Sequence, residues 1–269
     1  MKYKIDSETL TDIADAIRAK TGDSASMTPL EMPDEIASIS GGGDNWSQYI
    51  RRLTNTFYPL SNTAEEAVPS PLELDLPNCE QISQAFNRTK AFDEQRLVVI
   101  LHLDDENPTI KQLNQALYYS NIRDAKITGD LSGVTTYNYL IQYATSIEKI
   151  DAELDFTSVT STDTANIGNG GGTTLTFLRY KANTLSYSQT LTSQRVLDED
   201  SLISIANGLN ETATGQTLTL YSTRKTLCNS IMGDVGMDSG NNYHVFTKNT
   251  SGATSLTNFI TSTKGWTLA

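Results

Sequence analysis

Seven acidic or basic side chains recur on segments in which leucine alternates with a polar residue. They are Glu73, Asp75, His102, Asp104, Asp130, Glu153 and Asp155. If the leucines of these segments point inward, the seven side chains form one polar row on the outer surface. A carboxylate-rich row could bind a glycan by hydrogen bonds, or a cation. For any single residue a solvated strand face is the simpler interpretation, but as a set the row is our candidate binding surface.

Catalytic chemistry has less support in the sequence. Two carboxylates across a cleft could hydrolyse a glycosidic bond, but with 32 acidic residues some pair is always available. The two histidines, His102 and His244, leave a Ser-His-Asp arrangement or a two-histidine metal site open, without a supporting motif. We therefore expect no enzymatic activity, no cofactor and no metal site.

Two other sets of residues have both a functional and a structural interpretation. The glycine run at 168–172 lacks the Lys-Ser/Thr pair of a phosphate-binding loop and is typical of a flexible loop. A group of tyrosines could form a sugar-stacking surface, but its helix-like spacing favours core packing. These residues are Tyr118, Tyr119, Tyr137, Tyr139 and Tyr143.

The composition indicates a soluble chain made in a reducing compartment. The 269 residues carry a net charge of -12, which argues against a nucleic-acid surface and a polybasic membrane patch. Cys79 and Cys228 are too few for a disulfide framework and have no metal-site spacing. The sequence shows no signal-peptide pattern and no apolar run long enough to span a bilayer.

The polar row depends on a strand pattern that repeats along the chain. Leu72-Glu73-Leu74-Asp75-Leu76 has the two-residue period of a strand with one buried face, and similar strings begin at Val99, Ile127 and Glu153. Repetition every ~22–28 residues predicts a solenoid. Segments with helical spacing follow the strands, for example Ile110, Leu113, Ala116 and Leu117. We expect an α/β fold, a leucine-rich-repeat-like solenoid over 44–269 with parallel strands and helical or irregular returns.

Both ends of this array need caps, because a terminal repeat cannot cover its own apolar edge. The candidates are 46–60 at the start and 255–269 at the end. We expect helices at 198–209, at about 224–232 and at 255–263, and strands at 217–221 and 266–269.

A small helical module is expected ahead of the solenoid, over 1–43. Apolar residues at helical spacing form two short stripes, and the glycines at 41–43 form a linker. Two short helices cannot bury both stripes alone, so the module is predicted to dock on another surface. The docking residues are Leu10, Ile13, Ile17, Leu30 and Ile36.

Three regions carry a resemblance to a known family. The string at 76–86 begins Leu-Pro-Asn and ends Ala-Phe, and it resembles BspA-like leucine-rich repeats. The strings at 198–209, 217–220 and 264–269 resemble BspA-like repeat proteins in tail regions of phages of Gram-positive bacteria. The segment at 10–22, with Met27-Thr28-Pro29 behind it, is similar to a leader module of phage tail and baseplate proteins.

The resemblance implies a non-enzymatic virion component that is made in the host cytoplasm. The helical module would anchor it to other tail or baseplate proteins. The solenoid would contact a protein, a host cell-wall glycan or a host surface protein, with no nucleic acid and no membrane insertion. We expect a homo-oligomer, with a trimer as the working assumption. The alternatives are a cell-wall glycan hydrolase of the virion and a bacterial surface adhesin, although no export signal supports the adhesin.

Overall fold

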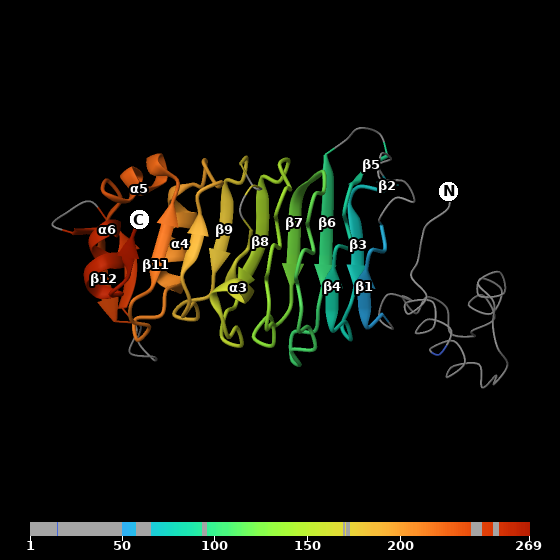
Figure 1. Ribbon diagram of the computed structural model, residues 1–269, viewed down its shortest axis with the longest axis horizontal. Coiled ribbons are helices and arrows are strands. Elements are labelled where there is room, and N and C mark those ends of the chain that lie inside the picture. Colours follow the sequence, from blue (N-terminus) through green and yellow to red (C-terminus); the bar gives the residue numbers. More distant parts are fainter. Residues whose placement is uncertain are drawn as a thin grey trace.

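The computed structural model describes residues 15, 50–57, 66–92, 96–168, 170, 173–237, 244–249 and 253–269. These residues form a mostly-β parallel solenoid of about 6 turns with few helices (Figure 1). The turns follow one another along the long axis of the molecule. The predicted helical module, with Leu10, Ile13, Ile17, Leu30 and Ile36, lies outside the described residues.

Five parallel strands form the main sheet of the solenoid. Its order is β3 (Leu72–Asp75), β6 (Leu97–His102), β7 (Ile122–Thr128), β8 (Lys149–Leu154) and β9 (Phe177–Tyr180). Leu72 pairs with Val99, Val99 with Ala125, and Ala125 with Ile150, so successive partners are 27, 26 and 25 residues apart. The predicted solenoid of parallel strands is therefore confirmed.

Shorter strands complete the turns. β1 (Arg52–Thr54) pairs with β4 (Gln81–Ser83), and β2 (Glu66–Val68) pairs with β5 (Thr89–Ala91), all in parallel. Single bridges through Gln112 and Thr136 continue the β4 column into the next turns. β10 (Gln189–Leu191), β11 (Thr217–Leu220) and β15 (Thr267–Leu268) form a second parallel sheet. The strands predicted at 217–221 and 266–269 are thus present.

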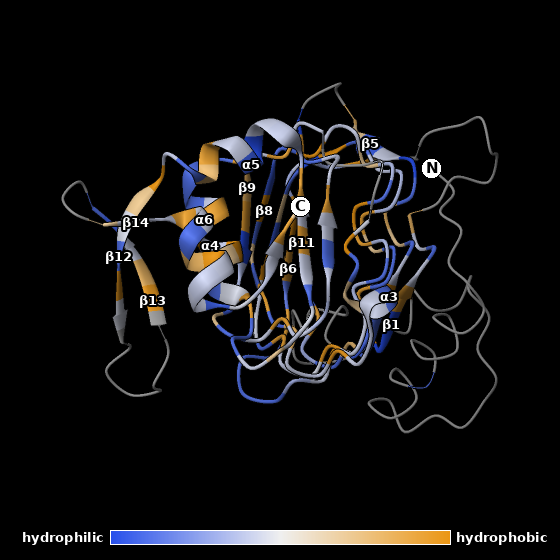
Figure 2. Cartoon of the chain, turned by 60° about the vertical axis from the view of Figure 1, so that its left-hand side comes forward, coloured by the Kyte–Doolittle hydropathy of each residue, from blue (hydrophilic) through white to orange (hydrophobic). Residues whose placement is uncertain are grey.

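The second half of the chain adds helices and one antiparallel sheet. The helices are α3 (Thr162–Ala165), α4 (Glu199–Gly208), α5 (Ser222–Cys228) and α6 (Leu256–Asn258), with a π-helix, η2 (Phe259–Thr263), directly after α6. α4, α5 and the α6–η2 segment correspond to the three predicted helices. β12 (Met232–Met237), β13 (His244–Lys248) and β14 (Thr254–Ser255) form the antiparallel sheet, which lies to one side of the stacked turns (Figure 2).

The expected α/β class is wrong, because the fold is mostly β with few helices. Of the two kinds of return expected, helical or irregular, the first turns of the solenoid have the irregular kind. The returns consist of short strands, bridges and turns, and each contains two non-glycine residues of positive φ, four positions apart. These pairs are Gln84 and Arg88, Gln115 and Tyr119, and Tyr139 and Tyr143, with φ between 50° and 59°. Such residues cost roughly 1–2 kcal/mol each. They turn the chain sharply enough that buried residues recur at a helix-like spacing.

The core is a continuous apolar column inside the turns. In β3 and β6 every second side chain points inward and is buried, as the leucine alternation predicts. Aromatic rings continue this column, because the Phe156 ring lies 4.9 Å from that of Tyr137 and 4.8 Å from that of Tyr180. The buried Tyr137 hydroxyl donates a hydrogen bond to the Asp155 carbonyl oxygen (2.9 Å) and accepts one from the Asp155 N–H (3.1 Å). Tyr137 is therefore a core residue.

Helix α4 covers the open edge of the main sheet at β9. The Ser201 hydroxyl accepts a hydrogen bond from the Leu178 N–H (2.9 Å) and donates to the Thr176 carbonyl oxygen (3.1 Å). The Ser204 hydroxyl likewise accepts from the Tyr180 N–H (3.1 Å). Two serines thus satisfy the backbone groups that a further strand would otherwise bond.

Substituting Ser201 with alanine should remove part of this edge cover. The Leu178 N–H would stay buried without a partner, which costs about 1–3 kcal/mol of unfolding free energy. Urea unfolding of S201A measures the loss. Ser230→Ala, which removes an exposed hydroxyl bonded to the Leu227 carbonyl oxygen, should change stability much less. Equal stability of the two variants would contradict the edge-covering role.

The segment predicted as the C-terminal cap, 255–269, ends the described solenoid. The buried Trp266 ring donates a hydrogen bond from its Nε1 to the Asn210 carbonyl oxygen (2.9 Å). Lys264 is also buried, and its ammonium donates to the Asn207 carbonyl oxygen (3.3 Å). Burial lowers the pKa of Lys264 from 10.5 to about 8. No helix in the described part of the chain is long and apolar enough to cross a membrane.

The buried ammonium predicts a pH dependence of stability. Between pH 8 and 10.5 the unfolded chain keeps the Lys264 proton that the folded chain has lost, so stability rises with pH in this window. Lys264→Met should stabilise the protein by about 1–3 kcal/mol at pH 7 and remove this rise. Thermal unfolding across the window measures both effects. The exposed Lys225→Met is the control, and a K264M profile parallel to that of the wild type would refute the assignment.

Candidate binding surface

The outward side chains of the main sheet form rows that cross the strands. Asp75 lies beside His102, and His102 beside Thr128. In the adjacent row, Glu73 pairs with Ile100, Ile100 with Lys126, and Lys126 with Asp151. Strand alternation places these residues outside, because the positions between them enter the core. Four predicted site residues, Glu73, Asp75, His102 and Glu153, lie on this face.

The imidazole of His102 links three strands. Its Nε2 lies 2.7 Å from Glu73 Oε1 on β3, and its Nδ1 lies 3.0 Å from Thr128 Oγ1 on β7. A neutral imidazole donates from one nitrogen and accepts at the other, so it can serve both partners. His244, the other histidine, belongs to β13 in a different sheet. His102 is thus used to join neighbouring turns.

Basic residues on the same face form ion pairs with carboxylates outside the predicted row, and together these pairs make a charge ladder. Arg96 contacts Asp124 (2.8 Å) and Glu148 (2.6 Å), and Arg123 forms an ion pair with Glu148. Further along, Asp151 accepts from Arg179 (2.7 Å) and Lys149 (3.3 Å). These side chains keep about 27–50 % of their surface exposed, so each pair contributes little to stability.

Sequence reasoning missed these basic residues because it followed the carboxylates alone. Arg123, Lys126 and Lys149 lie in the same strands as the acidic residues and alternate with buried positions. The alternation of buried and outward positions along the strands could therefore have predicted that these basic side chains lie on the outer face. The consequence is a face of mixed charge, on which electrostatic complementarity depends on the order of the charges more than on their sum.

The other three predicted residues, Asp104, Asp130 and Asp155, begin the turns that follow the strands. The carboxylate of Asp104 accepts from the N–H groups of Glu106 (2.8 Å) and Asn107 (3.0 Å). These donors, Asn107 first, lower the pKa of Asp104, and the Ser132 N–H lowers that of Asp130 in the same way. Asp155 accepts from the Thr157 N–H (2.9 Å). All three stabilise tight turns through local side-chain-to-backbone bonds.

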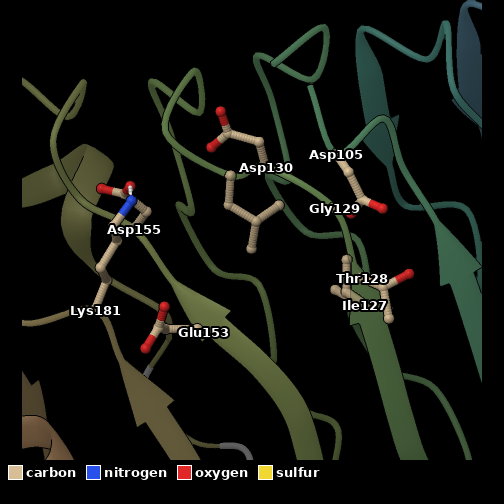
Figure 3. Close-up of a pocket in the computed structure, with 9 residues that line it drawn as sticks. Asp105, Ile127, Thr128, Gly129, Asp130, Glu153, Asp155 and Lys181 are labelled. Carbon is tan, nitrogen blue, oxygen red and sulfur yellow. Dashed lines mark hydrogen bonds and ion pairs between the residues drawn. The ribbon is translucent and has the colours of Figure 1, made fainter. Parts of the chain in front are cut away.

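A surface depression of about 300 Å³ lies where β7 and β8 end. Figure 3 shows Asp130 and Asp155 at the turns, Glu153 on β8, and Lys181 beside Asp155. The Lys181 ammonium lies 2.8 Å from Asp155 Oδ2, and this bond raises the pKa of Lys181. The depression thus brings together three of the seven predicted residues. Its polar lining suits a hydrogen-bonding ligand.

Other reactive groups were tested against catalysis and metal binding. Burial raises the thiol pKa of both Cys79 and Cys228 to about 12, so these thiols are protonated at neutral pH and poor nucleophiles. Among the described residues, no group of three or more His, Cys, Asp or Glu side chains could hold a metal ion.

Comparisons with protein-family models, with curated proteins and with solved structures find no significant match to this chain.

The turn aspartates provide a test of structural against binding roles. Asp155→Ala removes the carboxylate that accepts from Thr157 and Lys181 inside a nearly buried site, 2 % exposed. The loss of unfolding free energy should be about 2–3 kcal/mol. Asp104→Ala removes the equivalent exposed turn aspartate and should cost clearly less. Chemical denaturation compares the two, and a loss for Asp104→Ala as large as that for Asp155→Ala would contradict this explanation.

Proposed function

We propose that this protein is a non-enzymatic structural and binding component of a phage virion. The N-terminal module would anchor it to the tail or baseplate, and the solenoid would present the binding faces. The observation that carries the proposal is the elongated stack of about 6 turns, which follows in sequence a glycine-linked segment of helical pattern. Solenoids commonly bind partners on their long, regular surfaces. The resemblance to BspA-like proteins of phage tails supports the same role.

The charge ladder supports a contact function for the main-sheet face. Its ion pairs join side chains on or next to β6, β7, β8 and β9, and each pair is partly exposed. A partner with the complementary order of charges could exchange these pairs for intermolecular ones without leaving a buried charge unpaired. Other tail or baseplate proteins and a host surface protein are the proposed partners for this face.

Deleting residues 1–43 tests the anchoring role. The truncated chain should keep the circular dichroism spectrum and unfolding midpoint of the solenoid, yet be absent from purified phage particles, because the apolar docking stripes are gone. Immunodetection of the chain in particles measures incorporation. A full-length control with Lys225→Met, at an exposed position of α5, should be incorporated normally.

Three outcomes would contradict this proposal. Normal incorporation of the truncated chain, or its failure to fold, would remove the docking role from residues 1–43. Clearing of host cell walls by the purified full-length chain, abolished by Glu153→Gln, would favour the glycan hydrolase instead.

A further inference from the structure

A cluster of exposed tyrosines lies on the returns between the main-sheet strands. We call Tyr118, Tyr119, Tyr139 and Tyr143 the tyrosine ridge. Tyr119 and Tyr143 are 48 % and 47 % exposed and Tyr139 is 36 % exposed, whereas the core residue Tyr137 is buried. These rings therefore have a different role from the core packing that their spacing favours.

The ridge crosses successive turns of the solenoid. The Arg88 N–H donates to the Tyr119 carbonyl oxygen (3.1 Å), and the Tyr119 N–H donates to the Gln142 carbonyl oxygen (3.0 Å). Arg88, Tyr119 and Tyr143 therefore stack at closely equivalent positions of three turns. Neighbouring turns are ~4.8 Å apart. The exposed groups form a line along the solenoid, which suits an elongated ligand.

Three of the ridge tyrosines occupy strained backbone positions. Tyr119, Tyr139 and Tyr143 all have φ between 50° and 59°, a region in which asparagine and glycine are better tolerated than a bulky residue. In the next turn Gly170, with φ of 84°, lies against Tyr143. A Cβ on Gly170 would lie 3.4 Å from the Tyr143 ring. Other turns hold Gln84, Arg88 and Gln115 at the equivalent positions with the same sign of φ, so the backbone turn does not itself require tyrosine there.

Three of the four ridge tyrosines, Tyr118, Tyr119 and Tyr143, hold one another's rings in position. The centroid of Tyr143 lies 5.7 Å from that of Tyr118 and 6.1 Å from that of Tyr119, both edge to face. The Arg88 guanidinium lies 5.3 Å from the Tyr119 centroid. A platform that is already ordered loses little side-chain entropy on binding.

Apart from Arg88 in the preceding turn, the two segments that carry the ridge tyrosines have almost no charged residues, although the chain carries a net charge of -12. The segment at 131–147 has no Asp, Glu, Lys or Arg, and the segment at 107–122 has Lys111 alone. Polar groups there are amides and hydroxyls, such as the half-buried Asn138 and Gln142 beside Tyr139 and Tyr143. This chemistry does not suit a nucleic acid, which needs clustered cations. It suits a neutral sugar chain, whose rings have an apolar C–H face and a rim of hydroxyl groups.

We infer that the tyrosine ridge is a binding site for a neutral polysaccharide chain. Sugar rings would stack on the exposed tyrosines of successive turns, and neighbouring amides would bond their hydroxyls. This inference rests on the binding role proposed for the solenoid and gives it a second, uncharged face with a defined ligand class.

The test uses the purified full-length chain and four neutral hexasaccharides, of β-1,4-N-acetylglucosamine, β-1,4-glucose, α-1,4-glucose and β-1,4-mannose. Calorimetry should show binding of at least one. Tyr119→Asn and Tyr143→Asn should each weaken it about tenfold. Asparagine tolerates the left-handed backbone, so both variants should unfold at the wild-type temperature or higher. Lys225→Met on α5 and Val196→Asn at an exposed apolar site should bind as the wild type.

Binding of none of the four sugars, or binding that both asparagine variants retain, would overturn the inference. A lower unfolding temperature for both variants with unchanged binding would show instead that the rings serve the fold. Because sugar binding is measured on the free chain and anchoring on assembled particles, failure of either proposal is recognised separately.

Discussion

The parallel hydrogen bonding between successive turns is the constraint on which this structure depends. Each strand satisfies its backbone groups only through the turn before it and the turn after it, so stability arises between neighbours. Pairing of Leu72 with Val99 and of Val99 with Ala125 keeps the inward rows in line. A one-residue shift would expose a whole apolar row. The last strand of the sheet has no following strand, and α4 meets that need with two serine hydroxyls.

The strand half of this fold can be read from the sequence, but the returns cannot. Leucine alternation at Leu72–Leu76 predicts a strand with one inward face, and the repeat length predicts stacking. The returns could not be predicted because Gln84 and Arg88 both have positive φ, a backbone conformation that is uncommon for either residue type. Helix α4 was predictable because its apolar stripe is long and Asp198 caps its first turn.

The candidate surface was predictable in its position but only partly in its chemistry. Asp75 and His102 face outward as alternation requires. Asp104 and Asp130 each lie two residues beyond the end of a strand, where their carboxylates accept hydrogen bonds from N–H groups of the turn. The arginines that form ion pairs on this face were overlooked, because only carboxylates and histidines were considered as candidate binding residues on it. Tyr119 and Tyr143 were assigned to the core because a helical periodicity was assumed where the chain bends at left-handed residues.

The direction of the turn-to-turn bonds has a mechanical consequence. The strands lie across the long axis, so the bonds that join them run along it (Figure 1). A pull on the two ends of the rod would load every interface in series, and the weakest interface would set the strength of the whole. A sideways load on one turn would be shared with the turns that flank it. Such a rod is better suited to lying along a surface than to being stretched from its tip.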